Sequence, residues 1–268
     1  MLLKNTKDFD LKQTFECGQC FRWNPDSEGY TGVVGDYIIH AKQSGSTIEI
    51  DGADDEFIIE YFDLDRNYEK VKSKISNDDI IKKAVLYGGG IRILRQDPWE
   101  ALVSFIISAN NNIPRIKRII ESLCRTFGKP LTKGGKEYYS FPTAEVLSHL
   151  KACDLSPLRC GYRDGYIIDA AQRVATGALD LFAIYNMDED EGRRMLKTVK
   201  GVGDKVADCV LLFAYGKYGV FPRDVWIKRM MNRLYSVDEK EVDAFARQKF
   251  GKLGGFAQQY LFFYGRSG

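Results

Sequence analysis

A lysine and an aspartate that follow a glycine-rich turn are the residues of this chain best placed for covalent chemistry. The stretch from Leu196 to Asp224 reads LKTVKGVGDKVADCVLLFAYGKYGVFPRD, with Lys205 just after the GVG turn and Asp224 nineteen positions further on. The glycines permit a tight turn with positive φ, and the helix expected next presents free backbone N–H groups that can bind a phosphate. Lys205 falls in the first turn of that helix, where the helix dipole favours a neutral, nucleophilic amine over an ammonium.

Taken together, GVG-x-K-VADC and the following P-x-DV segment resemble the helix-hairpin-helix (HhH-GPD) DNA glycosylases, and above all the 8-oxoguanine DNA glycosylase/AP lyases among them. A GxG turn alone would as readily join two packed helices without any chemistry, but Cys209 and Asp224 stand in register with Lys205 and argue against that alternative. The resemblance implies a bifunctional base-excision DNA repair enzyme. Such an enzyme flips 8-oxoguanine out of duplex DNA, excises it through a lysine Schiff base and cleaves the abasic site by β-elimination.

The resemblance also gives the two catalytic candidates their roles. Lys205 would be the nucleophile, and Asp224 would stabilise the cationic sugar as the glycosidic bond breaks. A plain helix N-cap is the alternative for Asp224.

A pocket for the flipped base follows from the same resemblance. In the segment CGQCFRW, the carbonyl of Gly18 would face N7, which is an N–H donor in 8-oxoguanine but an acceptor in guanine. Gln258 would bind the Watson–Crick edge, while Phe262 and Cys209 would cover the two faces of the base. Residues 258 and 262 are four apart, hence on one face of a helix. A β-bulge at Gly18 and ordinary core packing of Phe262 and Cys209 are the alternatives.

The segments SANNNIPRIKR and RCGYRDGY resemble the part of these enzymes that contacts the base left unpaired by flipping. Asn110 would fill the vacated position, and Tyr162 would act as a wedge. Arg115 and Arg163 would read the estranged cytosine, because arginine only donates and cytosine offers O2 and N3 as acceptors. A solvated, asparagine-rich helix end is the alternative.

Three further positions are assigned to DNA by the resemblance: Gly201 and Gly203 in the hairpin, and Trp226. Trp226 stands where related enzymes often have a phosphate-binding histidine, and an indole N–H can donate to a phosphate but carries no charge. The hairpin of this family can hold a structural cation, here through carbonyls near residues 197, 199 and 202. No cofactor and no catalytic metal are expected.

The elements that must position these residues predict an α+β fold. Short β-rich runs and turn signals alternate from Phe15 to Asp51, which indicates an antiparallel meander. We expect a small N-terminal antiparallel β-sheet domain (TBP-like) over residues 1–91 and a mostly α-helical domain of two subdomains over residues 92–268, with the hairpin at about 196–206. Helices are expected at 68–75, 78–87, from 97 to about 128, and at 143–151, 162–176, 189–199, 204–215, 224–235, 239–250 and 254–264.

Charge and composition limit the function classes. The net charge of +2 is small, but residues 105–136 carry seven bases against one acid, whereas residues 51–60 carry five acids and no base. A basic run is most often a solvated helix face, yet this one flanks the proposed site. The chain has no run of about 18 apolar residues and no signal-peptide core, so we expect no membrane association.

We expect a cytoplasmic monomer, nucleoid-associated in a bacterium or nuclear in a eukaryote, whose partner is duplex DNA containing 8-oxoguanine. The six cysteines lack the spacing of a zinc site, and a redox role for Cys17 and Cys20 is the weaker alternative to reduced structural thiols. Two other functions stay open: the same scaffold acting on alkylated bases or oxidised pyrimidines, and a DNA-binding hairpin module without catalysis.

Overall fold

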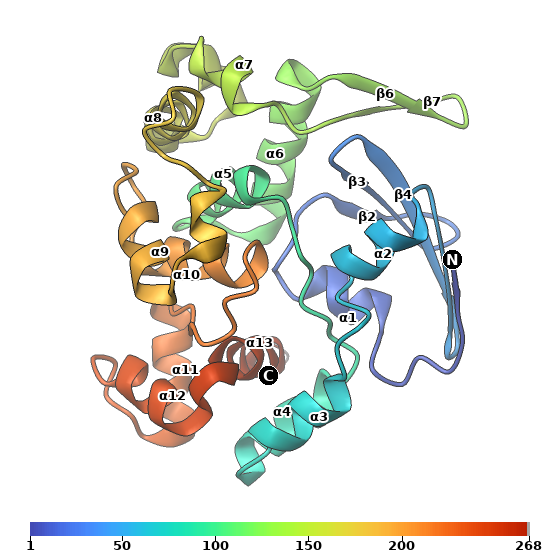
Figure 1. Ribbon diagram of the computed structural model, residues 1–268, viewed down its shortest axis with the longest axis vertical. Helices are drawn as coiled ribbons and strands as arrows, with labels where there is room; N and C mark the ends of the chain where they lie inside the picture. Colours follow the sequence, from blue (N-terminus) through green and yellow to red (C-terminus); the bar gives the residue numbers. More distant parts are fainter. Residues whose placement is uncertain (267–268) are drawn as a thin grey trace.

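The computed structural model describes residues 1–266, and its N-terminal part is a five-stranded antiparallel sheet (Figure 1). The strands are β1 (Leu2–Leu3), β2 (Trp23–Pro25), β3 (Tyr30–Val34), β4 (Tyr37–Ser44) and β5 (Thr47–Asp51), in the order β1-β5-β4-β3-β2. Helices α1 (Leu11–Glu16) and α2 (Asp55–Tyr61) lie between this sheet and the helical part of the molecule. The Phe15 and Trp23 rings stack at 4.0 Å in the small core between them. The predicted meander is confirmed.

One predicted β-rich run is wrong in its first part. Residues 11–16 form α1, because Asp10 caps that helix by accepting a hydrogen bond from the Gln13 N–H. The chain then turns at Gly18, which has φ +86°, and reaches extended strand geometry only at Trp23. The segment CGQC is therefore a turn between a helix and a strand.

The last two helices before the predicted boundary at residue 91 pack on the helical part and not on the sheet. Helix α3 (Tyr68–Ile75) places the Tyr68 ring 5.6 Å from Phe256, and helix α4 (Asp79–Tyr87) places the Tyr87 ring 5.3 Å from Phe263. Their buried side chains belong to the large helical core, whereas the sheet has a core of its own. The division at 91/92 stays a prediction.

The rest of the chain is mostly helical and falls into two groups, α5–α8 and α9–α13, above and below in Figure 1. The α-helices are α5 (Pro98–Ser108), α6 (Ile113–Phe127), α7 (Ala144–Ser148), α8 (Asp164–Ala175), α9 (Glu189–Leu196), α10 (Asp204–Phe213), α11 (Val225–Tyr235), α12 (Val242–Phe250) and α13 (Gly254–Gly265). Helices α5 and α10 meet at the centre, where the Phe105 and Phe213 rings stack at 5.4 Å. Within the described residues, no helix is both long and apolar enough to span a membrane.

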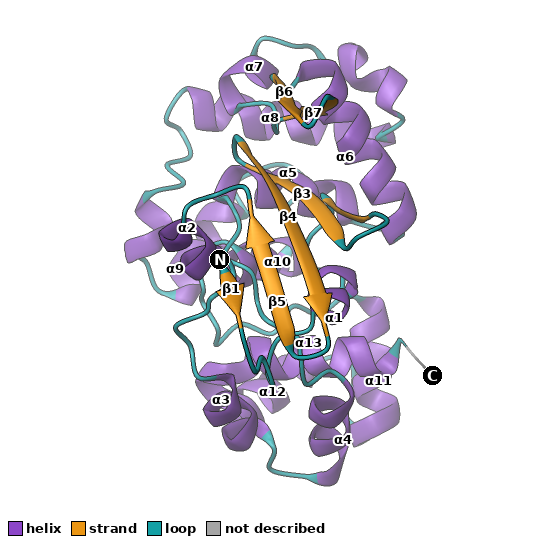
Figure 2. Ribbon diagram, turned by 90° about the vertical axis from the view of Figure 1, so that its right-hand side faces the viewer, coloured by secondary structure: helices purple, strands orange, loops and turns teal. Residues whose placement is uncertain are grey.

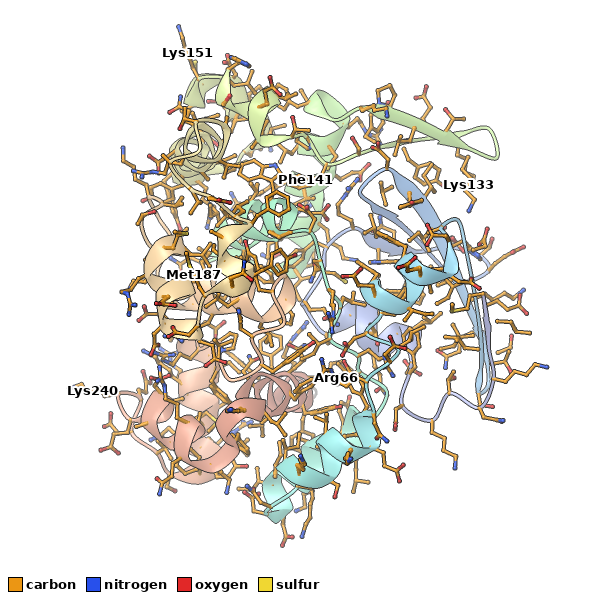
Figure 3. All side chains as sticks on the ribbon, in the orientation of Figure 1. Arg66, Lys133, Phe141, Lys151, Met187 and Lys240 are labelled. Atoms are coloured by element: carbon orange, nitrogen blue, oxygen red, sulfur yellow. The ribbon has the colours of Figure 1, made fainter. Side chains whose placement is uncertain are left out.

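A β-hairpin that the sequence did not predict lies between the helix expected to end at about 128 and the helix expected to begin at 143. Strands β6 (Pro130–Lys133) and β7 (Lys136–Tyr139) pair across Gly134 and Gly135, both with positive φ, as a two-residue hairpin turn requires. Lys133 points from the hairpin toward the N-terminal sheet (Figure 3), where it donates to the Ile38 carbonyl at 3.0 Å. The hairpin thus connects the helical part to the sheet (Figure 2).

Candidate active site

The glycine-rich turn joins α9 to α10 as a helical hairpin. Gly201 has φ +79°, and a Cβ there would lie 2.1 Å from the Tyr166 ring, so both the conformation and the space require glycine. Gly203 is the N-cap of α10, and no side chain caps the first N–H groups of that helix. Both glycines are exposed. The end of α10 therefore presents free donors at the surface, as an anion-binding helix terminus does.

Lys205 lies in the first turn of α10 and points toward α5. Its Nζ donates to Ser108 Oγ at 2.8 Å and lies 5.3 Å from the centre of the Phe105 ring. The Ser108 hydroxyl in turn donates to the Phe105 carbonyl at 2.8 Å. The amine is thus held by a serine that sequence reasoning did not identify, because nothing in the sequence distinguishes the last residue of an apolar helix.

Asp224 is the N-cap of α11, as the alternative interpretation held, and it also faces the candidate site. One carboxylate oxygen, Oδ1, accepts from the Ile227 N–H at 2.8 Å. The residue also lines the same cavity as Lys205. The cap thus fixes the position of the carboxylate at the start of α11.

A cavity of about 110 Å³ brings together the two predicted catalytic residues and the four predicted to form the base pocket. It is lined by Gly18, Phe21, Phe105, Ser108, Asn111, Ile113, Ile116, Lys205, Cys209, Phe213, Pro222, Asp224, Ile227, Gln258, Gln259 and Phe262. This volume is below the roughly 300 Å³ at the low end of ligand pockets. A side chain must therefore move before a purine can enter.

Phe262 is the side chain best placed to move. A Cβ atom added at Gly18 would lie 3.2 Å from the Phe262 ring. The ring therefore lies close to the Gly18 backbone, and little space is left between the two at the cavity. The Trp226 ring meets Phe262 edge-on at 5.3 Å, and the Arg266 guanidinium lies 5.4 Å from the ring centre. Trp226, predicted to contact phosphate, thus supports the ring that fills the pocket in the DNA-free protein.

The side chain of Gln19 fixes the turn that carries Gly18 through hydrogen bonds to the backbone. Gln19 is fully buried, and the sequence did not indicate its role. Gln19 Nε2 donates to the carbonyls of Arg92 and Thr14 at 2.7 and 2.9 Å, and its Oε1 accepts from the Leu94 N–H at 2.9 Å. These three bonds fix a backbone segment that would otherwise be an irregular loop. The position of the Gly18 backbone is therefore set before any ligand binds.

Gln258 leaves a hydrogen-bond acceptor unused at the cavity. The residue is only 5% exposed, and its Oε1 has no hydrogen-bond partner among the described residues. Because buried polar atoms in proteins are almost always paired, such an acceptor indicates a place for a ligand donor. Across the cavity, burial raises the pKa of the Cys209 thiol to about 11, so the wall there is neutral and apolar.

The residues predicted to contact the opposite base lie together next to this cavity; Asn110, Arg115 and Tyr162 are exposed, whereas the Arg163 guanidinium is buried on protein atoms. Asn110 has a left-handed backbone with φ +49°. Arg163 is 3% exposed, donates to the carbonyls of Ala109 and Asn110 at 3.0 and 3.2 Å, and lies 4.4 Å from the Tyr162 ring. Exposed Arg115 donates to the Arg159 carbonyl at 3.2 Å. Arg163 thus supports the Asn110 loop from inside.

The predicted cation site in the hairpin stays a prediction. Of its proposed ligands, the Val199 carbonyl accepts a hydrogen bond from the Val202 N–H at 3.2 Å. Within residues 1–266, no group of three or more His, Cys, Asp or Glu side chains is arranged to hold a metal ion.

Comparison with known proteins gives two family matches. The model of the 8-oxoguanine DNA glycosylase N-terminal domain matches residues 1–102. The model of the HhH-GPD superfamily base excision DNA repair proteins matches residues 103–254, more than half of the chain. Together the two matches cover nearly the whole sequence.

Comparisons with individual proteins agree with the two family matches. The N-glycosylase/DNA lyase of Saccharomyces cerevisiae is 33% identical over 263 residues, which are 87% of this chain and 70% of that protein. A probable N-glycosylase/DNA lyase of Methanothermobacter thermautotrophicus is 34% identical over 66% of this chain, and the match spans 64% of that protein, slightly under two thirds. The crystal structure of Clostridium acetobutylicum 8-oxoguanine glycosylase/lyase, in complex with double-stranded DNA containing cytosine opposite to 8-oxoG, is 43% identical with a TM-score of 0.95 and covers 99% of this chain and 94% of that one. The chain therefore belongs to the HhH-GPD superfamily of base excision DNA repair proteins.

Proposed function

We propose that this protein is a bifunctional 8-oxoguanine DNA glycosylase and AP lyase that acts on duplex DNA. The observation that carries the proposal is one small cavity that holds an amine, a carboxylate and an unpaired amide carbonyl, from Lys205, Asp224 and Gln258. A cavity with those three groups can bind a base, stabilise a sugar cation and attack it. Relatives named as N-glycosylase/DNA lyases and an 8-oxoguanine glycosylase structure support the same reaction.

Chemistry begins when the base enters the cavity, since C1′ is out of reach while the base is stacked in the duplex. As the bond from C1′ to the base breaks, the base leaves with the electron pair and takes up a proton, and the Asp224 carboxylate stabilises the positive charge on the sugar. The lone pair of Lys205 Nζ forms a bond to C1′, and the proton that Nζ then loses is the one taken up by the departing base. The C1′–O4′ bond breaks with transfer of the second Nζ proton to O4′, which gives an imine between Nζ and C1′. Loss of a C2′ proton then expels the 3′ phosphate.

The lesion is recognised by hydrogen-bond polarity. The N7–H of 8-oxoguanine would donate to the Gly18 carbonyl, where guanine would place a second acceptor. Gln258 Oε1 would accept from the N–H groups of the Watson–Crick edge, which satisfies the atom left unpaired in the free protein. Phe262 would swing from its place against Gly18 and stack on the base, opposite Cys209.

The opposite base would be contacted by Asn110, Arg115, Tyr162 and Arg163, and DNA phosphates by the hairpin N–H groups at Gly201 and Gly203. We further propose that the protein works as a monomer wherever the cell keeps its DNA. The solvent-exposed N-terminal end of α10 and the basic helix α6 support these proposed contacts with DNA.

Borohydride trapping tests the proposal. Wild type is incubated with duplexes carrying 8-oxoguanine, guanine or a preformed abasic site opposite cytosine, and imines are reduced to stable crosslinks. We expect crosslinks with the first and third duplexes and none with guanine. Lys205→Gln should abolish them, whereas Lys200→Gln, at an exposed lysine of the same hairpin, should not. A crosslink that survives in Lys205→Gln would refute the assignment of the nucleophile.

A further inference from the structure

A closed ring of alternating acids and bases lies beside the cavity, and none of its members lines the cavity. We call it the ion ring. Its members, in order of contact, are Asp190, Arg193, Asp208, Arg223, Asp243 and Arg247, and the last contacts the first. The ring joins α9, α10, the loop before α11, and α12. It is not part of the chemistry proposed above.

At the centre of the ring, Asp208 is buried and its contacts with two arginines are short. Asp208 is 0% exposed, and its two oxygens contact different arginines, Arg193 Nε at 2.7 Å and Arg223 Nη1 at 3.2 Å. The same Arg223 nitrogen lies 2.9 Å from Asp243 Oδ1. Burial raises the pKa of Asp208, while the two guanidinium groups favour its charged form. A buried carboxylate with both oxygens occupied has little freedom to move.

The ring reaches both catalytic candidates through the chain itself. Asp208 is three residues after Lys205, on the same helix. Arg223 comes directly before Asp224, and Pro222 on its other side lines the cavity. The loop that connects the two groups runs from residue 214 to 224 and contains Gly216 and Gly219. The contact between Asp208 and Arg223 therefore ties the helix of the amine to the loop of the carboxylate.

We propose that Arg223 is a positioning residue, which through Asp208 sets the distance between the Asp224 carboxylate and the Lys205 amine. The inference rests on the proposed function, because it concerns the same two groups. Catalytic groups must be held to within about 0.5 Å, and a displacement of about 1 Å can cost on the order of 100-fold in rate. Without the contact, the loop keeps the α11 cap and the hydrogen bond from the Lys217 N–H to the Leu211 carbonyl of α10, but its end next to Asp224 loses its ion pair to α10.

The chain offers a matched control at a second buried aspartate. Asp63 is 3% exposed and is contacted by two arginines, Arg66 and Arg95. Arg66, beside α3 (Figure 3), also donates to the Tyr218 hydroxyl at 3.1 Å, within the loop before α11, and is therefore not a suitable control. The Arg95 guanidinium donates to Asp63 alone among the described residues. Arg95→Ala and Arg223→Ala each remove one of two arginines from a buried aspartate, and only the second should affect the chemistry.

The test compares wild type, Arg223→Ala, Arg223→Lys and Arg95→Ala in single-turnover excision of 8-oxoguanine opposite cytosine. For Arg223→Ala we expect the maximal rate to fall about 10- to 100-fold while the Kd for the duplex changes less than about 3-fold. Arg223→Lys keeps the charge and should recover most of the rate. Trapping on a preformed abasic site should fall less than excision, because Lys205 stays on α10. Arg95→Ala should excise at the wild-type rate.

Three outcomes would overturn the inference: an unchanged rate in Arg223→Ala, equal losses in Arg223→Ala and Arg95→Ala, or an Arg223→Lys variant no better than Arg223→Ala. If Arg223→Ala does not fold, Asp243→Asn loosens Arg223 without leaving a buried acid unpaired, and it should lower the rate with an unchanged Kd; an unchanged rate there also overturns the inference. A wild type that excises nothing would instead refute the proposed function, and the inference with it.

Discussion

The cavity at Lys205 and the neighbouring group formed by Asn110, Arg115, Tyr162 and Arg163 handle hydrogen bonding in opposite ways. In the cavity, the Gln258 carbonyl oxygen is buried without a partner. In the neighbouring group, which we call the opposite-base cluster, the Arg163 guanidinium is occupied by backbone carbonyls. The cavity thus keeps the Gln258 acceptor free, whereas the opposite-base cluster uses the Arg163 donors to hold the Asn110 loop.

The difference indicates how the two sides respond to DNA. An unpaired buried acceptor destabilises the free protein and gains a full hydrogen bond when a donor arrives, so it discriminates strongly among bases. A buried guanidinium can bind a base only by giving up its present partners. Within the opposite-base cluster, exposed Arg115 is therefore better suited to read the estranged base, and Arg163 to hold the Asn110 loop in place.

The largest effect is expected on the cavity side, from Asp224→Asn. Asparagine caps a helix about as well as aspartate, so α11 and the fold should be retained, but the charge that stabilises the sugar cation is lost. Single-turnover excision of 8-oxoguanine should slow by about 100- to 1,000-fold. The melting temperature serves as the control. Near-normal excision would leave Asp224 with the helix cap as its only role.

Next in size is Arg163→Ala. The change leaves the carbonyls of Ala109, Asn110 and Cys160 without their present donor, which should lower the free energy of unfolding by about 2 kcal/mol or more. Because the Asn110 loop then loses its support, excision should slow about equally with cytosine or adenine opposite the lesion. Urea unfolding and excision from the two duplexes measure both effects. If the change instead abolishes the preference for cytosine and leaves stability intact, Arg163 itself reads the base.

Arg115→Ala should show the complementary result. Arg115 is exposed, and its one hydrogen bond here is to the Arg159 carbonyl, so stability should hardly change. The preference for cytosine over adenine opposite the lesion should fall by about 1–3 kcal/mol. Arg118→Ala, at an exposed arginine one turn further along α6, is the matched control and should weaken binding to both duplexes alike. Equal effects of the two changes would make Arg115 a phosphate contact.

The sequence could predict the features whose signals lie within a short stretch of the chain. The hairpin glycines, Lys205 and Asp224 stand in one short stretch, and periodicity gave most of the helices. The α1 helix and the β6–β7 hairpin were missed because a cap at Asp10 and a two-glycine turn decide them. Ser108 lies 97 residues from Lys205, and Gln19 lies 73 from the Arg92 carbonyl it binds. Contacts of that separation follow from the tertiary fold and have no signal in a single sequence.

The smallest expected effect concerns how fast two thiols are alkylated, Cys209 at the cavity and Cys153 on the surface. Cys209 is buried against the cavity and burial raises its pKa to about 11, whereas Cys153 is exposed. At pH 8 a thiol with such a pKa is only about 0.1% thiolate, so iodoacetamide should label Cys153 and leave Cys209 intact. Raising the pH toward 10 should increase Cys209 labelling by about tenfold per unit at most, because access still depends on Phe262. Phe262→Ala should speed that labelling at every pH, since it removes the ring that fills the cavity. Mass spectrometry of the labelled peptides distinguishes the sites, and Cys209 labelling at the same rate with and without the ring would show that the cavity of the free protein is already open.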